Sequence, residues 1–367
     1  MKIAFLFSTL EGFGLVKVAF SLLKELKNNS FDVHAITLSE EPANSMLDDF
    51  IQAGIPVHTL NMSRLKGMFY AQKTLTELVR KERFDILHSH GFRANLIHSQ
   101  IERRIPKTKT VMTIHLDPKD DARHPLGPLF SLWRTHKHIQ IIKNTEHVVA
   151  CAKSLSETLK KYNISIPYIQ NGIEMPLLSI DKQSEEQKKL QETTKGNPIS
   201  VVLSGLHHRK NIGTIIRAYN RLGENFPLII IGEGPDRKEL EEIAGKHIHF
   251  TGYQKEPADY LSAADIYLSA SYTEGLPLSV MEAMSYGIIP VLSNIPSHRE
   301  IVENTPFQNF LFSCNDEIQL YNHCKQLLEE KENRSLLKQQ AKMLIKEKFS
   351  SQKMANEYIN YYKKCLE

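Results

Sequence analysis

Short runs of apolar and β-branched residues alternate with longer segments of helical periodicity along most of the chain. In the first half, the short runs predict strands at residues 3–7, 33–38, 56–60, 86–88, 110–114, 147–150 and 168–170. Helical patterns such as 15–26 and 71–81 lie between them. Strands that alternate with helices in this way are typical of a parallel sheet with crossover helices. We therefore predict an α/β fold with a doubly wound parallel sheet.

The alternation stops after Asn171-Gly172 and restarts at residue 199. Residues 173–197 are largely polar, which is typical of a linker between domains. Further strands are predicted at 199–203, 228–231, 249–250, 265–269 and 288–292, and a final helix at 351–366. We therefore predict two Rossmann-like domains, 1–172 and 198–350. Because ligands in open parallel sheets bind beyond the carboxyl ends of the strands, a cleft between the domains is the default site.

Length and composition are consistent with two ordinary globular domains. The 367 residues are 41% hydrophobic and 24% charged, which excludes a disordered, collagenous or coiled-coil chain. The net charge of +4 is too near balance to indicate a nucleic-acid partner. The charge is uneven, since residues 1–180 carry 23 Lys and Arg against 17 Asp and Glu. The first half is therefore the basic one.

Cysteine use and hydropathy indicate a reducing cytosol. The chain has only four widely spaced cysteines, without a Cys-x-x-Cys pair, too few for a disulfide framework. The apolar run at 3–7 is shorter than the core of a signal peptide. No run of about eighteen apolar residues occurs, so we expect a cytoplasmic protein without a membrane span.

The segment 264–294 carries the strongest candidate chemistry. A predicted strand leads into a small polar loop with Glu274, and a helix follows with Pro277 near its first turn. Glu282 lies about one turn into that helix. Two carboxylates placed in this way can accept hydrogen bonds from vicinal hydroxyls, while the helix N-terminus attracts an anion. The alternative is that each Glu is an ordinary acid near a helix start, which is common.

As a whole, this segment closely resembles the signature of glycosyltransferase family 4, whose members are retaining nucleotide-sugar enzymes of GT-B fold. Glu274 and Glu282 match its Glu-x7-Glu pattern, and Ala-Met-x-x-Gly and Pro-Val follow. The resemblance implies that Glu274 binds the donor sugar and acts in catalysis, and that Glu282 binds the nucleotide ribose. Many members have Gly-Phe-Gly after the first Glu, where this chain has Gly275-Leu276-Pro277. Proline lacks a backbone N–H, so Leu278 and Ser279 are the expected phosphate donors.

A second segment, 201–211, reads as a strand, a glycine turn and the basic pair Arg209-Lys210 before a helix. Arg and Lys at a strand end can neutralise a leaving diphosphate, although an isolated basic pair is more often surface charge. By the resemblance, the pair corresponds to the family's phosphate clamp. Many members have an Arg directly after the glycine, where this chain has Leu206, so Arg209 is expected to supply that charge.

Two later strand ends also follow the family's order of elements. Gly232 follows the strand at 228–231, and Tyr253 follows the strand at 249–250. The resemblance implies that Gly232 binds the donor and that Tyr253 lines the nucleobase. A glycine turn after a strand needs no ligand to explain it, so each of these signals alone is weak.

In the first half, Gly12 and Gly14 lie between the first strand and a helix, where backbone amides can approach a phosphate. Lys17 occupies the third glycine position of the dinucleotide fingerprint, which disfavours an NAD enzyme. His115 ends the strand at 110–114, and a lone His there more often has a structural role. Family members often carry Thr-x-His at this place and use it against the donor sugar. The resemblance therefore assigns Gly12 and Gly14 to the donor and His115 to catalysis, and His88-Ser89-His90 resembles the family's Val-His-x-His.

We expect neither a metal nor a cofactor. His136-x-His138, His247-x-His249 and Asp120-Asp121 are fragments of possible metal sites, but none has a third ligand at a recognisable spacing. The chain has no P-loop and no Gly-x-Ser-x-Gly elbow.

Basic residues gather at 80–83 and 103–109 in the first half. Such runs are usually solvated faces, and the alternative is a patch that meets anionic lipid head groups. Family members often use lipid-linked acceptors, so peripheral attachment to the inner face of the membrane is a secondary hypothesis.

Together, these observations predict a retaining, metal-independent glycosyltransferase of GT-B architecture. It would move a hexosyl or N-acetylhexosaminyl unit from a nucleotide-sugar, with UDP favoured by family frequency, to a glycan or lipid-linked acceptor in cell-surface polysaccharide or glycoconjugate biosynthesis. The second domain would bind the donor and the basic first domain the acceptor. As in that fold, the final helix, about 351–367, would cross back to the first domain. Two alternatives are a nucleotide-sugar epimerase of similar fold and a non-catalytic partner of another transferase.

Overall fold

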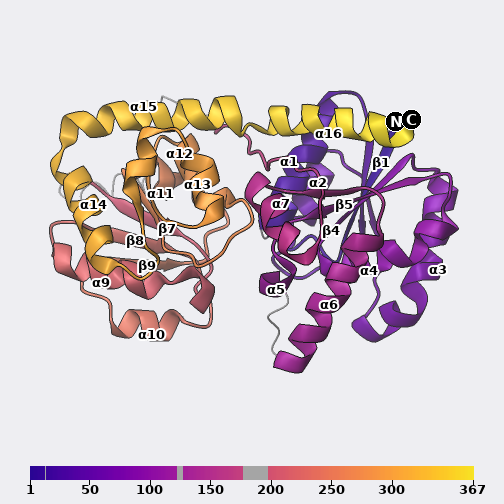
Figure 1. Ribbon diagram of the computed structural model, residues 1–367, viewed down its shortest axis with the longest axis horizontal. Helices are drawn as coiled ribbons and strands as arrows, with labels where there is room; N and C mark the ends of the chain where they lie inside the picture. The colour runs from indigo at the N-terminus through magenta and orange to yellow at the C-terminus, as the bar shows by residue number, and fades with distance from the viewer. Residues whose placement is uncertain (13, 122–126, 177–196) are drawn as a thin grey trace. The chain divides into compact units, whose positions relative to one another are not determined.

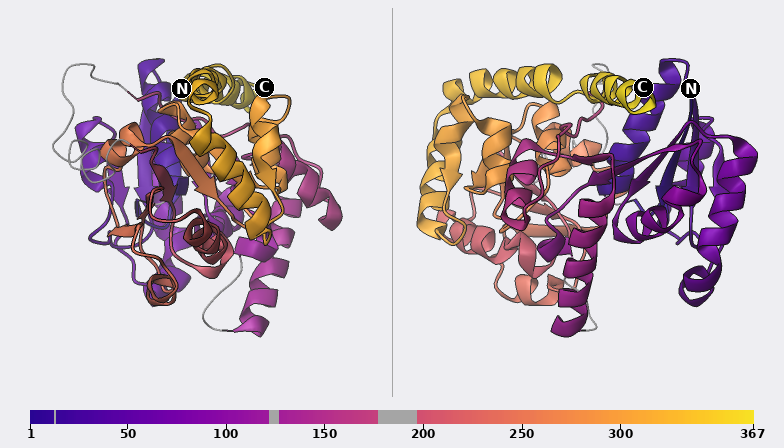
Figure 2. Two further views of the ribbon diagram at one scale, coloured as in Figure 1. Left: turned by 90° about the vertical axis from the view of Figure 1, so that its left-hand side faces the viewer. Right: turned by 45° about the vertical axis from the view of Figure 1, so that its right-hand side comes forward.

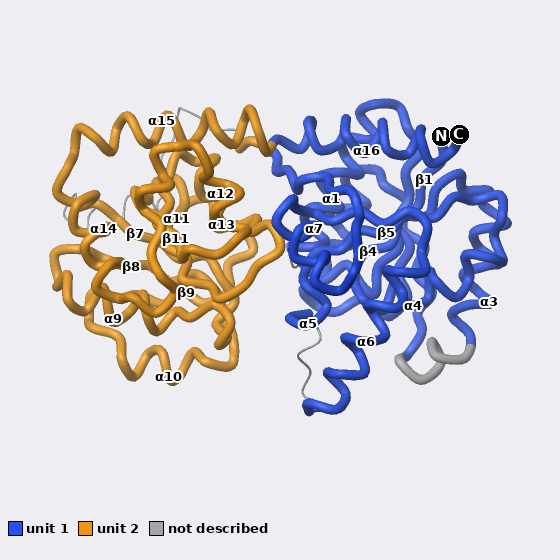
Figure 3. The backbone as a smooth tube through the Cα atoms, in the orientation of Figure 1, with its two compact units in different colours: residues 1–174, 350–367 blue, residues 175–349 orange. Residues whose placement is uncertain are grey.

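The computed structural model describes residues 1–12, 14–121, 127–176 and 197–367, without the side chains of residues 64–69. Phe13 and residues 177–196 of the predicted linker lie outside this part of the chain. Figure 3 shows two compact units, of which the first comprises Met1–Glu174 and Ser350–Glu367 and the second Met175–Phe349. Each unit has a six-stranded parallel sheet covered by helices on both faces (Figure 1 and Figure 2). The predicted class, two Rossmann-like parallel-sheet domains, is confirmed.

The strands of the first unit are β1 (Lys2–Phe7), β2 (Asp32–Thr37), β3 (Val57–Thr59), β4 (Ile86–His90), β5 (Lys109–Ile114) and β6 (Val148–Ala150). They pair in the order β3-β2-β1-β4-β5-β6, in which β1 and β4 are central and almost entirely buried. The helices are α1 (Gly14–Asn28), α2 (Leu47–Gln52), α3 (Arg64–Glu82), α4 (Phe92–Ile101), α5 (Pro118–Asp121), α6 (Pro128–Asn144), α7 (Lys153–Leu159) and α16 (Ser351–Leu366).

Alternation along β1 divides the core of this unit. Ala4 and Leu6 pack with α3 and α4 on one face of the sheet. Phe5 points to the other face, where its ring centroid lies 4.8 Å from that of His88. The last helix of the chain, α16, completes this second face, since the Tyr362 hydroxyl lies 2.7 Å from His88 Nδ1 and the helix packs against α1. The C-terminal helix is therefore part of the first unit's core.

The strands of the second unit are β7 (Ser200–Leu203), β8 (Leu228–Ile231), β9 (Ile248–Gly252), β10 (Ile266–Ser269), β11 (Ile289–Ser293) and β12 (Leu311–Phe312), in the order β12-β11-β10-β7-β8-β9. The helices are α9 (Ile212–Leu222), α10 (Arg237–Glu242), α11 (Ala258–Ala263), α12 (Leu278–Ser285), α13 (Pro296–Val302), α14 (Glu317–Glu329) and α15 (Lys331–Lys348). In Figure 1, α9 and α10 lie on one side of this sheet and α12, α13 and α15 on the other.

Two features differ from the sequence-based prediction. The strand predicted at 168–170 is absent, because Tyr168 forms only a single bridge, to Ala150. Pro167 precedes it and has no N–H to extend the ladder. The pattern also missed β12, which has only two residues.

Among the described residues, no helix combines the length and apolar character needed to cross a membrane.

Candidate functional site

Two loops meet at the carboxyl edge of the second sheet. β7 and β10 are neighbours and parallel, so the loops that follow them start side by side. The first loop leads to a 3₁₀ turn, η3 (His208–Lys210), and the second leads to α12. The Tyr272 amide donates a hydrogen bond to the Arg209 carbonyl oxygen over 2.9 Å, which ties the two loops together. Sequence positions some 60 residues apart thus form one surface.

Glu274 lies at the centre of this surface between two cations. Its Oε1 accepts from Lys210 Nζ at 2.5 Å and from Ser271 Oγ at 2.7 Å, and its Oε2 accepts from Arg209 Nη1 at 2.9 Å. Arg209 Nη1 also donates to the Thr273 carbonyl over 2.7 Å. Only 9% of the Glu274 side chain is exposed, against 15% for Lys210 and 22% for Arg209. The structure therefore brings together the three charged residues that the sequence assigned to donor and diphosphate.

The charges fix the ionisation of Glu274. Burial alone would raise the pKa of this carboxyl, but the charges of Lys210 and Arg209, with hydrogen bonds from Lys210 and Ser271, lower it to about 2. Glu274 is thus a carboxylate at any physiological pH and a very weak base. It is suited to accepting hydrogen bonds from hydroxyl groups rather than to removing protons.

Asn211, next to the basic pair, anchors the first loop. It has a left-handed backbone with φ of 52°, which Asn tolerates better than most residues. Its Nδ2 donates to the carbonyl oxygens of Cys314 at 2.7 Å and Ala270 at 3.3 Å. Sequence reasoning missed this role, and the local signal for it was an Asn directly before a helix.

The other predicted acid, Glu282, lies on α12, which begins at Leu278 after Pro277. The first amides of a helix, here those of Leu278 and Ser279, have no partner within the helix. The Ser279 Oγ lies 2.9 Å from the hydroxyl of Tyr267, a buried residue of β10 that sequence reasoning missed. Burial, with the negative charges of Glu274 and Glu282, raises the pKa of this hydroxyl well above its usual value. Both carboxylates thus act on the same tyrosine.

A buried histidine contacts the end of β10, from which the Glu274 loop leaves. His298 of α13 lies with Nδ1 2.8 Å from the Ser293 carbonyl oxygen and Nε2 3.4 Å from Ser269 Oγ, at the end of β10. Burial lowers its pKa to about 4. This neutral residue, also missed by sequence reasoning, holds the strand end from which the Glu274 loop leaves.

Gly232 and Tyr253 follow β8 and β9 at the same edge. Gly232 has φ of 145°, and a Cβ there would lie 1.9 Å from the Ser204 carbonyl oxygen. Its amide donates to the Gly252 carbonyl over 2.9 Å. Close approach of backbones therefore explains this glycine without a ligand. The Tyr253 side chain is 54% exposed, which leaves its ring available to a binding partner.

The remaining predicted residues lie in the first unit. The Gly12 amide donates to the Asn44 carbonyl over 3.2 Å, and Gly14 is the exposed first residue of α1. His115 follows β5 at the carboxyl edge, and its Nε2 lies 3.0 Å from Nδ1 of His90, at the end of β4. Burial lowers the pKa of His115 to about 4, so the ring is neutral near pH 7. These three residues and the Glu274 surface belong to different units.

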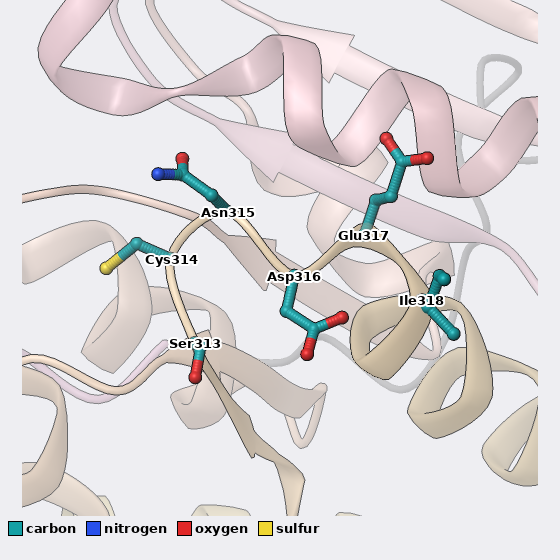
Figure 4. Close-up of a pocket in the computed structure, with 6 residues that line it drawn as sticks. All are labelled: Ser313, Cys314, Asn315, Asp316, Glu317 and Ile318. Carbon is teal, nitrogen blue, oxygen red and sulfur yellow. The ribbon is translucent and has the colours of Figure 1, made fainter.

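A hollow of about 520 Å³ lies beside the loop that Asn211 anchors, and it is formed by the residues that follow β12 (Figure 4). Residues 313–318 line it, and Figure 4 shows the carboxylates of Asp316 and Glu317 on opposite sides of the backbone. Glu317 binds Arg217 and Arg221 over 2.7 and 2.9 Å. The lining of the hollow includes none of Arg209, Lys210 and Glu274, so the hollow adds no residue to the Glu274 surface. Within the described part of the chain, no group of three His, Cys, Asp or Glu is arranged to hold a metal ion.

Two family models match successive halves of the chain: "Glycosyltransferase Family 4" over residues 14–175 and "Glycosyl transferases group 1" over residues 183–344. The chain is 24% identical to the UDP-Gal:alpha-D-GlcNAc-diphosphoundecaprenol alpha-1,3-galactosyltransferase of Escherichia coli, over 83% of this chain and 81% of the relative. It is also 24% identical to the O-antigen biosynthesis glycosyltransferase WclY of Escherichia coli, over 99% and 98%.

Solved structures share the fold over nearly the whole chain. Anabaena HepE in complex with UDP-glucose superposes with a TM-score of 0.83 at 17% identity, over 99% of this chain and 100% of HepE. Sucrose-phosphate synthase from Thermosynechococcus elongatus gives 0.80 at 16% identity, over 99% and 98%.

Proposed function

Since this chain belongs to the family 4 glycosyltransferases of GT-B fold, we propose that it transfers a hexosyl or N-acetylhexosaminyl unit, with retention at the anomeric carbon, from a UDP-sugar. The proposed acceptor is a glycan or lipid-linked glycan in the biosynthesis of a surface polysaccharide or glycoconjugate. The names of two relatives support this acceptor class, since one acts on a diphosphoundecaprenol-linked sugar and another in O-antigen biosynthesis. The complex of HepE with UDP-glucose supports the choice of UDP.

The observation that carries the proposal is the position of Glu274 between Lys210 and Arg209. Departure of UDP places negative charge on the diphosphate, and fixed cations stabilise a transition state in which that charge develops. Arg209 and Lys210 supply this positive charge, so we assign it to them rather than to a metal ion. Glu274 holds hydroxyls of the transferred sugar, because its carboxylate is ionised and lies beside both cations.

The remaining contacts of the donor follow from its chemistry. Leu278 and Ser279 offer helix N-terminal amides to phosphate oxygens, and Glu282, on the same helix, accepts from the ribose hydroxyls. The exposed ring of Tyr253 stacks on the base. As part of the same proposal, we assign Gly12 and Gly14 to donor binding and His115 to catalysis, and we assign acceptor binding to the first unit.

The proposed reaction needs no enzyme nucleophile. The acceptor hydroxyl attacks the anomeric carbon on the face from which the diphosphate leaves. The bond from carbon to phosphate oxygen breaks as the new glycosidic bond forms, and the acceptor proton passes to the leaving phosphate. Glu274, with a pKa of about 2, stays ionised throughout and contributes charge and orientation only.

Glu274→Gln tests this proposal, with Glu317→Gln as the matched control. Both acids are held by two cations, but the cations of Glu317 are Arg217 and Arg221 rather than Arg209 and Lys210. UDP release and product formation should fall at least about a hundredfold for Glu274→Gln and stay near wild type for the control. Equal activity of both variants would contradict the proposal. Conversion of the donor to an isomeric nucleotide-sugar without acceptor would identify an epimerase, and an inactive wild-type chain would favour a non-catalytic partner.

Because the proposed acceptor class includes lipid-linked glycans, we place the enzyme in the cytoplasm on the inner face of the membrane, attached through its first unit. The exposed basic residues Arg103 and Arg104 favour anionic lipid. The first turns of α6 expose three large apolar side chains: Leu129 at 82%, Leu132 at 66% and Trp133 at 51%. An apolar helix end that carries a tryptophan suits the interfacial region of a bilayer.

Trp133 is the single tryptophan of the chain, so its fluorescence reports on α6 alone. Vesicles with anionic lipid should shift its emission to shorter wavelength, and Leu132→Ser should weaken this response. Leu336→Ser, at a 56% exposed position of α15, is the control and should bind like wild type. Emission that is unchanged by vesicles would exclude this attachment.

A further inference from the structure

Three histidines lie in contact beneath the carboxyl edge of the first sheet. The ring centroid of His90 lies 4.2 Å from that of His88 and 5.3 Å from that of His115. His88 uses both nitrogens, with Nδ1 2.7 Å from the Tyr362 hydroxyl and Nε2 2.7 Å from Thr113 Oγ1. His88 is therefore a fully bonded core residue, and His90 and His115 form a pair above it.

His90 is the buried member of this pair. Only 2% of its surface is exposed, and its ring stacks on Phe7 with centroids 5.5 Å apart. Its Nδ1 lies 3.0 Å from Nε2 of His115, while its own Nε2 has no hydrogen-bond partner among the described residues. Burial lowers the pKa of His90 well below its usual value and that of His115 to about 4. Both rings are therefore neutral near pH 7, and one proton lies between them.

The position of that proton follows from the environment of His90. If His115 donated from its Nε2, Nδ1 of His90 would have to accept, and the single proton of His90 would lie on the Nε2 of His90 as a buried N–H without an acceptor. If His90 donates from its Nδ1 instead, the Nε2 of His90 carries no proton and is a buried acceptor without a donor. An orphaned buried N–H is rarer in proteins than an under-used acceptor, and each unmet group costs desolvation energy. The second arrangement is therefore the more stable.

We infer that His90 is a positioning residue that donates from Nδ1 to His115 Nε2, and so holds the proton of His115 on Nδ1. The hydrogen bond made by one ring nitrogen sets the state of the other. His115 then presents an N–H donor, suited to a substrate oxygen such as a sugar hydroxyl, and not a lone pair that could accept a proton. This inference rests on the proposed place of His115 beside the donor sugar.

Nuclear magnetic resonance reads the tautomers directly, without turnover. Long-range proton–nitrogen spectra of the full-length protein with labelled histidine, assigned through variants, should show both His115 and His90 protonated on Nδ1 at about pH 7. His90→Phe keeps an aromatic ring beside Phe7 but has no donor, so His115 should lose its fixed Nδ1–H state. His90→Asn offers an amide donor near the same place and should restore it. A His115 protonated on Nε2 in the wild type would overturn the inference.

Turnover tests the substrate contact separately. His115→Asn keeps an N–H near the place of Nδ1, whereas His115→Gln carries its amide towards the place of Nε2. The kcat/KM of His115→Asn should be about tenfold higher than that of His115→Gln. The kcat/KM of His90→Phe should be about tenfold lower than that of the wild type, and His90→Asn should recover it. The control His138→Phe replaces another buried histidine of the first unit, on α6, and should change neither tautomer nor turnover.

The outcomes separate the two proposals. A Gln variant as active as the Asn variant overturns the donor role of His115. His115→Asn, His115→Gln and His90→Phe could all turn over like wild type while the spectra show the expected tautomer. In that case the contact of His115 with the substrate is wrong, but the hydrogen bond from His90 to His115 stands. Loss of activity in Glu274→Gln is independent of either result, so a failure at His115 leaves the proposed function intact.

Discussion

Glu274→Gln should destabilise the protein most at neutral pH and progressively less in acid. Burial opposes ionisation of this carboxyl, but Lys210 and Arg209 lower its pKa from 4.5 to about 2. A carboxyl with a lower pKa in the folded chain contributes stability that is fully present well above pH 4.5 and is lost as the pH falls through about 2. The difference between these pKa values corresponds to a contribution of about 3 kcal/mol to the free energy of unfolding at pH 7, of which about 1 kcal/mol is lost by pH 4.

Urea unfolding followed by far-ultraviolet circular dichroism at pH 7 and at pH 4 measures this effect. Gln has the shape of Glu but no charge, so it leaves Lys210 and Arg209 without their shared partner at either pH. Glu317→Gln is again the control, since its side chain is more exposed, at 24%, and should cost less at both values. An equal loss for Glu274→Gln at the two pH values, or no loss at pH 7, would refute the assignment of its stability to ion pairing.

Two further substitutions probe donor binding by calorimetry, and a third probes the backbone at the edge of the second sheet by unfolding. Lys210→Ala should weaken UDP binding about tenfold, because a charged hydrogen bond to phosphate is lost, whereas Arg217→Ala, on α9, should leave the affinity within about twofold. Tyr253→Ala should weaken UDP binding by a similar factor if its ring stacks on the base, and wild-type affinity would remove that contact. Gly232→Ala should prevent folding or cost more than about 3 kcal/mol, since its Cβ would meet the Ser204 carbonyl. Gly223→Ala, which also has positive φ but open space around it, should cost only about 1 kcal/mol, and equal costs would show that the clash is relieved.

The local pattern of apolar and polar residues was sufficient to predict the strands and the position of the Glu274 loop. Parallel strands covered on both faces are nearly continuous apolar runs, as in β1 and β8, and a polar residue directly after such a run lies at the ligand-binding edge. The neighbouring positions of β7 and β10 then bring Arg209 and Lys210 to Glu274. The sequence predicted the residue types of this surface, but not that the two cations share one carboxylate.

Contacts between distant segments were beyond the pattern. Asn211 bonds to the carbonyl of Cys314, which lies in a loop after a two-residue strand that has no periodicity to detect. Tyr267 and His298 appear in the sequence as ordinary apolar and helical positions, and only folding brings them to the Glu274 loop. The pairing of His90 with His115 likewise depends on the register of β4 with β5.

The place of α16 has a consequence for synthesis on the ribosome. Its residues Tyr358 and Tyr362 close the face of the first sheet that contains His88, yet they are translated only after all of the second unit. The first unit can therefore bury this face only after the whole chain has been translated, whereas all of the second unit is translated before α16. Until then the uncovered face exposes apolar surface, which is prone to aggregation and is the kind of surface that chaperones bind.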